Sequence, residues 1–194
     1  MKEKVTLIYG IEQGAIAKIK NEKQHEYDEP KIWESLIQLT ESIKESIDAF
    51  YADDKTWAVV NGQTEIDGKL ECYTVPQEIR EYLGWEKVDK NGASVEIATP
   101  APVRCALLYT YKTNAGIRRA CLYDVTFAKP NLALNTVKDK VNPSTTTINY
   151  KAVPVVFDTF DEPVTKIKSN SATPKEVVDA WYQKVTLPIK KDVM

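Results

Sequence analysis

The sequence predicts a mainly β protein, an antiparallel β-sandwich or barrel of about seven to eight strands decorated by two short flanking helices. Several runs alternate apolar and polar residues with the period of two that a half-buried strand requires. Only two stretches carry clear signals for the start and end of a helix. Strand and helix signals do not alternate along the sequence, which argues against a parallel sheet.

The clearest strand is "EIDGKLECYTV", which begins at Glu65. Its even-numbered positions are apolar or small, so we expect that face to pack on the core. Its odd-numbered positions form a face toward water, with the residues Glu65, Asp67, Lys69 and Glu71.

A hairpin is predicted from "VRCALLYTY" and "IRRACLYDVTF", which are separated by the turn-like "KTNAG". Simple alternation places Cys121, Tyr123, Val125 and Phe127 on one face of the second strand. We therefore expect all four side chains to enter the same core.

Two short helices complete the pattern. In "VPQEIREYLGW", Pro76 is suited to the helix start and Gly84 to its end. In "TPKEVVDAWYQKV", Thr173 is predicted as the N-cap, with Glu176 three residues later completing a capping box.

The segment "IWESLIQLTESIKESIDAFY" leaves the choice between helix and strand open. Its apolar residues recur at three- and four-residue steps, as in a helix. However, Ile37, Leu39, Ile43 and Ile47 would also share one face of a strand.

Length and composition favour a single domain over residues 1–194, with an extended polar loop near 20–31 and a loose C-terminal tail near 186–194. A formal net charge of −2 and a pI near 5.6 argue against a protein that grips nucleic acid. No signal peptide or membrane span is expected. The three cysteines, Cys72, Cys105 and Cys121, lie in apolar runs and are predicted to be buried free thiols.

The string Tyr-Ala-Asp-Asp at 51–54 matches a metal-binding turn of polymerases that copy RNA into DNA. Such an enzyme needs a further aspartate well upstream, and Asp28 and Asp48 leave no room for the intervening fold. Asp53 and Asp54 are therefore predicted to form a turn between strands. No phosphate-binding glycine loop or serine nucleophile motif is present, and His25 is the one histidine. The expectation is no enzymatic activity, no cofactor and no metal. A carboxylate-based β-sandwich enzyme stays open as an alternative.

The order of the elements resembles that of the major tail protein family, the tail tube subunits of long, non-contractile-tailed bacteriophages. The matching stretches are "FYADDKTW", "TEIDGKLECYTVP", "QEIREYLGW", the hairpin with its Asn-Gly turn and proline-rich entry, "NPSTTTINYKAVPV" and "PKEVVDAWYQKV". The resemblance extends from about Val5 to Val185. It implies the phage tail tube fold, and it implies that residues 35–51 form a strand with Ile37, Leu39, Ile43 and Ile47 inward.

The same resemblance implies a structural virion protein that assembles into stacked, hexameric rings. DNA would pass through the tube without specific binding, and tape-measure, tail terminator and distal tail proteins would be its partners. The protein would reside in the virion tail and, before assembly, in the host cytoplasm. Other phage modules, such as a head–tail connector, a capsid protein or a host-binding domain, remain alternatives.

For such a subunit, two sets of residues are candidates for contacts. The outward side of "EIDGKLEC", with Glu65, Asp67, Lys69 and Glu71, is a candidate lumen wall, with an ordinary solvated strand face as the alternative. The candidate subunit or ring contacts are Tyr27, Tyr51, Asp53, Asp54, Trp57, Asn131 and Asn142.

Overall fold

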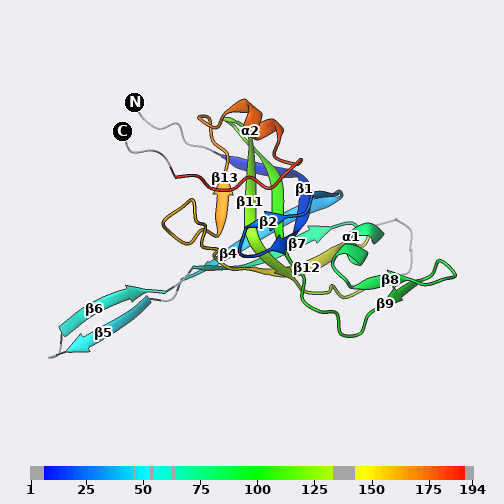
Figure 1. Ribbon diagram of the computed structural model, residues 1–194, viewed down its shortest axis with the longest axis horizontal. Helices are drawn as coiled ribbons and strands as arrows, with labels where there is room; N and C mark the ends of the chain where they lie inside the picture. The colour runs from blue at the N-terminus through cyan, green and yellow to red at the C-terminus, as the bar shows by residue number, and fades with distance from the viewer. Residues whose placement is uncertain (1–6, 46, 53–54, 63, 133–142, 191–194) are drawn as a thin grey trace.

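The computed structural model describes residues 7–45, 47–52, 55–62, 64–132 and 143–190. Nine strands form one antiparallel sheet (Figure 1). They are β1 (Ile8–Asn21), β2 (Glu26–Tyr27), β3 (Lys31–Trp33), β4 (Leu36–Lys44), β7 (Glu65–Cys72), β10 (Arg104–Thr113), β11 (Gly116–Phe127), β12 (Thr146–Ala152) and β13 (Lys166–Lys168).

Two hairpins and two helices complete the described elements. They are β5 (Ile47–Ala52) with β6 (Lys55–Asn61), β8 (Glu86–Val88) with β9 (Ser94–Glu96), α1 (Gln77–Tyr82) and α2 (Lys175–Asp179). The predicted class, mainly β and antiparallel with two short helices, is confirmed. Among the described strands the sheet does not close into a barrel.

The main sheet runs in the order β2–β1–β10–β11–β12–β7–β4, with β3 paired to β1 and β13 paired to β11. β3 and β4 are consecutive in the chain, yet β3 pairs near one end of the sheet and β4 forms the other end. The chain turns between them at Ser35, which has a φ of 67°. A Cβ placed on Gly14 of β1 would lie 2.5 Å from Leu36 Cδ1, so the two ends approach closely there. The sheet is thus strongly curled, with a seam between β1 and β4.

Side chains on the concave side of the curled sheet form the main core. It includes Trp33, Leu70, Leu107, Leu122 and Ile148, all fully buried. Burying an aliphatic side chain of this size contributes roughly 1.5–3 kcal/mol. This core explains the alternation in β7 and β12, whose other faces are polar.

A second apolar cluster lies on the opposite side of β1, β10 and β11. Trp181 and Val185, which follow α2, pack there with Tyr123 and Phe157. β10 and β11 are therefore buried on both sides over most of their length. Of the tail predicted to be loose, near 186–194, residues 186 to 190 lie against this layer, and 191–194 lie outside the described residues. Tyr123 Oη donates to the Thr186 carbonyl at 2.8 Å, and the Lys190 amide donates to the Thr159 carbonyl at 3.0 Å.

The prediction that one face of β11 carries Cys121, Tyr123, Val125 and Phe127 is wrong. Cys121 and Tyr123 lie in the outer cluster, whereas Val125 and Phe127 lie in the main core. The register between β10 and β11 shifts between the pairs Cys105–Val125 and Leu107–Leu122. This β-bulge changes which face each following residue occupies.

The three cysteines are buried, as predicted. Cys72 lies beside Ile148 and Leu70 in the main core, and burial raises the pKa of its thiol to about 11. Because the thiolate is the reactive form, this sulfur stays protonated at neutral pH.

The helix α1 ends as predicted. The Gly84 amide donates to the Glu81 carbonyl and the Trp85 amide to the Arg80 carbonyl, with Gly84 at a φ of 73°. This double closure requires the left-handed backbone that glycine adopts without strain.

The capping box of the second helix does not form. Pro174 occupies the N-cap position, and the Thr173 hydroxyl instead accepts the Asn170 amide at 2.9 Å. The Thr173 side chain, predicted to cap the helix, therefore stabilises the turn that precedes it.

Gly68→Ala should destabilise the fold, because a Cβ at position 68 would overlap the ring of Tyr150 on the neighbouring strand. Overpacking of this kind costs about 1–3 kcal/mol. Urea unfolding of the variant measures the loss. The exposed neighbour Asn149 gives the control, because Asn149→Ala should unfold like the parent. Equal midpoints for the two variants would contradict the close packing at Gly68.

Candidate functional site: a polar sheet face beside an open edge

The polar side of β7 lies opposite the main core. Ile66, Gly68, Leu70 and Cys72 are buried, and the four residues that alternate with them, starting at Glu65, are partly or fully accessible. The shared face predicted for Glu65, Asp67, Lys69 and Glu71 is therefore present.

Neighbouring strands extend this polar face on both sides. Thr40 of β4 and Asn149 of β12 both lie opposite Lys69. In the same way, Ser42 and Lys151 flank Asp67. The residues of this surface, here called the polar face, are Thr40, Ser42, Lys44, Glu65, Asp67, Lys69, Glu71, Thr147, Asn149 and Lys151.

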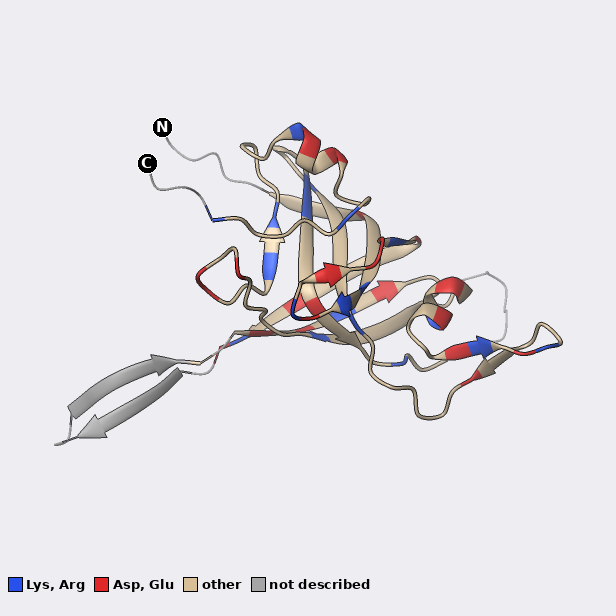
Figure 2. Cartoon of the chain, in the orientation of Figure 1, with Lys and Arg blue, Asp and Glu red and all other residues tan. Residues whose placement is uncertain are grey.

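Charges on the polar face are balanced across strands. Lys44 pairs with Asp67, and Lys151 Nζ lies 2.6 Å from Glu65. The hydrogen bond from Lys44 lowers the pKa of the Asp67 carboxyl, and Glu65 raises the pKa of the Lys151 ammonium. Figure 2 shows positive and negative segments interleaved along the sheet. The strand that is acidic in sequence therefore becomes part of a surface with mixed charge.

A hollow of about 1050 Å³ lies on this side of the sheet and reaches from the polar face to Arg104 and Asp124. The Asp124 side chain is only 2% exposed, and Arg104 Nε lies 2.9 Å from its Oδ1. A second guanidinium nitrogen of Arg104 also contacts this carboxylate. These hydrogen bonds raise the pKa of Arg104, so the guanidinium stays charged.

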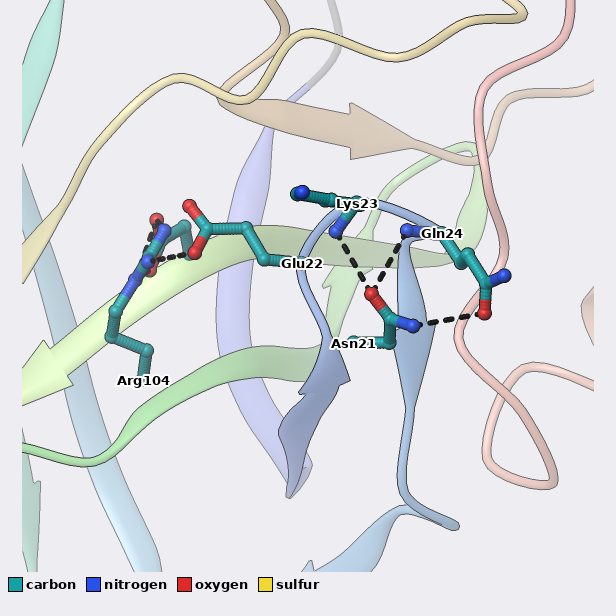
Figure 3. Close-up of polar contacts among 6 residues, drawn as sticks. Asn21, Glu22, Lys23, Gln24 and Arg104 are labelled. Atoms are coloured by element: carbon teal, nitrogen blue, oxygen red, sulfur yellow. Dashed lines mark hydrogen bonds and ion pairs between the residues drawn. The ribbon is translucent and has the colours of Figure 1, made fainter.

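Arg104 also holds the turn after β1. Its Nη1 lies 2.9 Å from Glu22 Oε2 (Figure 3). In the same turn Asn21 Oδ1 accepts the amides of Lys23 and Gln24, at 3.1 and 3.3 Å (Figure 3). Residues 20–31, predicted as an extended loop, are instead the end of β1, a tight turn, β2 and the start of β3. An Asx turn and an ion pair fix a segment whose polar composition suggested an open loop.

Tyr27, a predicted contact residue, lies in this segment. It is half-buried against the outer cluster, and burial raises the pKa of its phenol. Asn131 is exposed, next to the exposed Leu132. The structure therefore leaves Asn131, more than Tyr27, available to another molecule.

The edge strand β4 differs in part from its prediction. Leu39 and Ile43 lie opposite Leu70 and Ile66 and so share the core-facing side of β7. Ile43 is nevertheless 62% exposed, because β4 is the last strand and no other described element covers it. Ile37 lies at a register shift between Leu36 and Gln38 and is also exposed. The predicted side is therefore correct for Leu39 and Ile43, although Ile43 remains exposed, whereas Ile37 is exposed at the register shift. The predicted extended conformation is present as two strands, β4 and β5.

The hairpin β5–β6 carries the other predicted contacts. Tyr51 pairs with Thr56 and Phe50 with Ala58, so Trp57 is the extra residue of a β-bulge. Within the described chain the two strands pair only with each other. Asp53, Asp54 and Asn142 lie outside the described residues, as do the side chains of Ile47, Tyr51 and Trp57.

Sequence reasoning missed the Arg104–Asp124 pair. Its signal was a single charge within each of two otherwise apolar strands, "VRCALL" and "CLYDVTF". In a hairpin such charges are expected to pair, because an isolated buried carboxylate is costly.

No group of three or more His, Cys, Asp or Glu residues in the described ranges is arranged to hold a metal ion. Among these residues no helix is long and apolar enough to cross a membrane. The chain matches no protein-family model and no curated protein sequence.

Arg104→Met should destabilise the protein by roughly 2–4 kcal/mol, because it leaves the buried Asp124 carboxylate unpaired while Arg104 itself is partly exposed. Thermal and urea unfolding measure the effect. A surface pair gives the control: Lys129→Met, which removes the pair with Glu96, should cost less than about 1 kcal/mol. Adding Asp124→Asn to Arg104→Met should recover part of the loss. Equal costs for the two single variants would show that Asp124 needs no partner.

Proposed function

We propose that this protein is a self-assembling structural subunit of a bacteriophage tail tube. Copies would associate into rings, hexameric by the resemblance of the sequence, and the rings would stack into a tube that conducts DNA. The observation that carries the proposal is the edge of β4, which no other strand among the described residues pairs with, and which carries an exposed isoleucine beside a polar face of balanced charge.

The free edge supports self-association. An edge strand presents unpaired backbone donors and acceptors, and monomeric proteins usually protect it with charges, prolines or bulges. β4 has its register shift near Leu36, but its far half, toward Lys44, remains regular and carries Ile43. Repeating the same head-to-tail contact around a rotation axis closes a ring and removes every free edge.

The polar face supports a conducting role. Unpaired lysines along a channel would hold DNA phosphates, because each contact releases condensed counterions. On this face the lysines at 44 and 151 are engaged by carboxylates of β7. A wall of this kind gives DNA neither strong attraction nor strong repulsion. In the proposed tube it would line the lumen, and the tape-measure, tail terminator and distal tail proteins would be partners.

Electron microscopy of the purified protein tests the proposal. Negatively stained samples should contain rings or tubes of uniform width, and light scattering should show a mass several times that of one chain. If the protein stays monomeric at high concentration, even when tail proteins are added, the proposal is wrong.

Ile43→Lys should reduce assembly without unfolding the chain. The position is on the free edge and exposed, so the stability of the monomer should change by less than about 0.5 kcal/mol. A charge there opposes both edge pairing and apolar contact with a neighbour. Sedimentation velocity measures the assembled fraction.

Ile117→Lys is the matched control. Ile117 is similarly exposed, at 56%, but lies near the turn between β10 and β11. Assembly that falls equally in both variants would argue against β4 as the contact edge.

A further inference from the structure

A second hollow, of about 380 Å³, lies at the seam between β1 and β4. Its volume falls within the range of pockets that bury small ligands. β1 and β4 form its sides, and β10 and β13 contribute residues. The hollow, here called the seam pocket, is lined by Ile8, Tyr9, Gly10, Ile11, Ile37, Gln38, Leu39, Glu41, Tyr109, Tyr111, Lys166 and Lys168.

Irregularities in both strands accompany the opening of the seam. A Cβ on Gly14 would lie 2.5 Å from Leu36 Cδ1, so β1 and β4 are close together at that point. Beyond it, the register of β1 against β10 shifts twice between Tyr9 and Gln13, and the register of β4 against β7 shifts next to Leu36. Such shifts bend a strand and redirect its side chains. Among the described strands β1 and β4 do not pair with each other, which leaves the seam pocket between them.

The walls of the seam pocket are largely apolar. Ile11 and Leu39 pack against the main core, whereas Ile8 and Ile37 are 71% and 37% exposed. Tyr9 adds an aromatic side chain that is 55% exposed. Exposed apolar side chains that gather in one place often mark a binding site, whereas single scattered ones do not. The walls therefore fit a ligand with an apolar body.

The least exposed charges of the seam pocket satisfy one another. Tyr109 Oη donates to Glu41 Oε1 at 2.7 Å, and Lys166 pairs with the other carboxylate oxygen. The side chains of Glu41 and Lys166 are only 16% and 14% exposed. These three groups hold β4, β10 and β13 together and leave Glu41 neutralised toward a ligand.

Lys168 gives the seam pocket an excess of positive charge. It is exposed, and within the described part of the chain its ammonium has no ion-pair partner. Two lysines against one glutamate give the lining a formal charge of +1. Tyr111 Oη also lacks a hydrogen-bond partner among the described residues, and Arg118 lies opposite Tyr111 in the ladder. A carboxylate fits this end of the pocket, because a charged donor and a hydroxyl are both available to it.

From these features we infer that the seam pocket binds a medium-chain alkanoate ion. Its aliphatic chain lies between β1 and β4, and its carboxylate lies at Lys168 and Tyr111. Residues 37–41 of β4 extend over roughly 13 Å at about 3.3 Å per residue, so the groove is elongated. At roughly 30 Å³ for each water-sized group, the volume corresponds to about a dozen non-hydrogen atoms, the size of decanoate.

Binding at this place joins the two ends of the curled sheet. A ligand that binds only the folded chain stabilises it in proportion to the logarithm of its concentration. Sodium decanoate, kept below the concentration at which it forms micelles, should therefore raise the midpoint of thermal unfolding. Decyltrimethylammonium, which has the same chain length and a positive head group, should not raise it. Equal effects of the two amphiphiles would overturn the assigned charge preference.

Photolabelling of the full-length chain tests the location. The probe is decanoate with a diazirine on its alkyl chain, and it can be used on single and on assembled chains. Mass spectrometry should find the label in peptides that contain residues 8–11, 37–41 or 166–168, and excess decanoate should remove it. Label confined to other peptides, or label that decanoate does not displace, would overturn the inference.

A charge variant tests the carboxylate end. Lys168→Glu should raise the dissociation constant of decanoate, measured by titration calorimetry, roughly fivefold, as for the loss of one exposed ion pair. Lys168→Arg should retain the parent affinity. Lys184→Glu, at an exposed lysine outside the lining, is the control and should also bind like the parent.

An apolar variant tests the chain end independently. Ile37→Ser should raise the same dissociation constant roughly three- to tenfold, because it removes apolar contact with the alkyl chain. Ile32→Ser is the matched control, since Ile32 is 39% exposed and outside the lining. Unchanged affinity in both Lys168→Glu and Ile37→Ser would show that decanoate binds elsewhere.

The inference is independent of the proposed assembly. Rings that form from a chain without affinity for decanoate would overturn the seam pocket as a binding site and leave the tube subunit intact. A monomeric chain that binds decanoate in the seam pocket would have the opposite result.

Discussion

The turn at Ser35 links the strands that pair at the two ends of the main sheet. Before it, β3 pairs with β1, and after it β4 pairs with β7 at the opposite end of the sheet. One chain segment therefore links both ends, and the sheet must curl for this to be possible. Within the described residues, the curl encloses the main core, leaves β4 as an edge strand and forms a hollow at the seam between β1 and β4.

The protein is most fully buried where strands are covered on both sides and more exposed at the edge of the sheet. β10 and β11 have apolar neighbours on both sides, and the Arg104–Asp124 pair crosses them and also holds the turn after β1. At the other extreme, β4 is covered on one side and paired along one edge only, within the residues described. The surface proposed to contact other copies thus lies at the edge of the sheet. Contacts there do not require the packing of β10 and β11 to change.

The sequence predicted those features that depend on local periodicity. β7 alternates strictly because one side faces the core and the other faces water, and Gly84 ends α1 because its backbone angle suits glycine. The reversal of faces in β11 was not predictable, since a β-bulge depends on the register of the partner strand. The exposure of Ile43 was missed for a related reason: the pattern shows which side a residue faces but not that its strand is the last one.

The ion pairs of the polar face were likewise not predictable from the sequence. β7 alone carries three acids and one base among its outward residues, which suggested an acidic wall. Lys44 and Lys151 come from strands on either side of it, and their pairing was visible only once the order of strands was known. The turn at 21–24 likewise depends on Arg104, more than 80 residues later in the chain.

The continuity of β4–β7 with β5–β6 has a mechanical consequence. A pull on the hairpin along its length is carried into β4 and β7 together. It then reaches β12 through the antiparallel ladder that runs from Ile66 to Cys72. Such a load is parallel to the strands, so it shears the hydrogen bonds of that ladder simultaneously instead of opening them one at a time. The β5–β6 hairpin is therefore joined to the sheet in a geometry that resists tension along its strands.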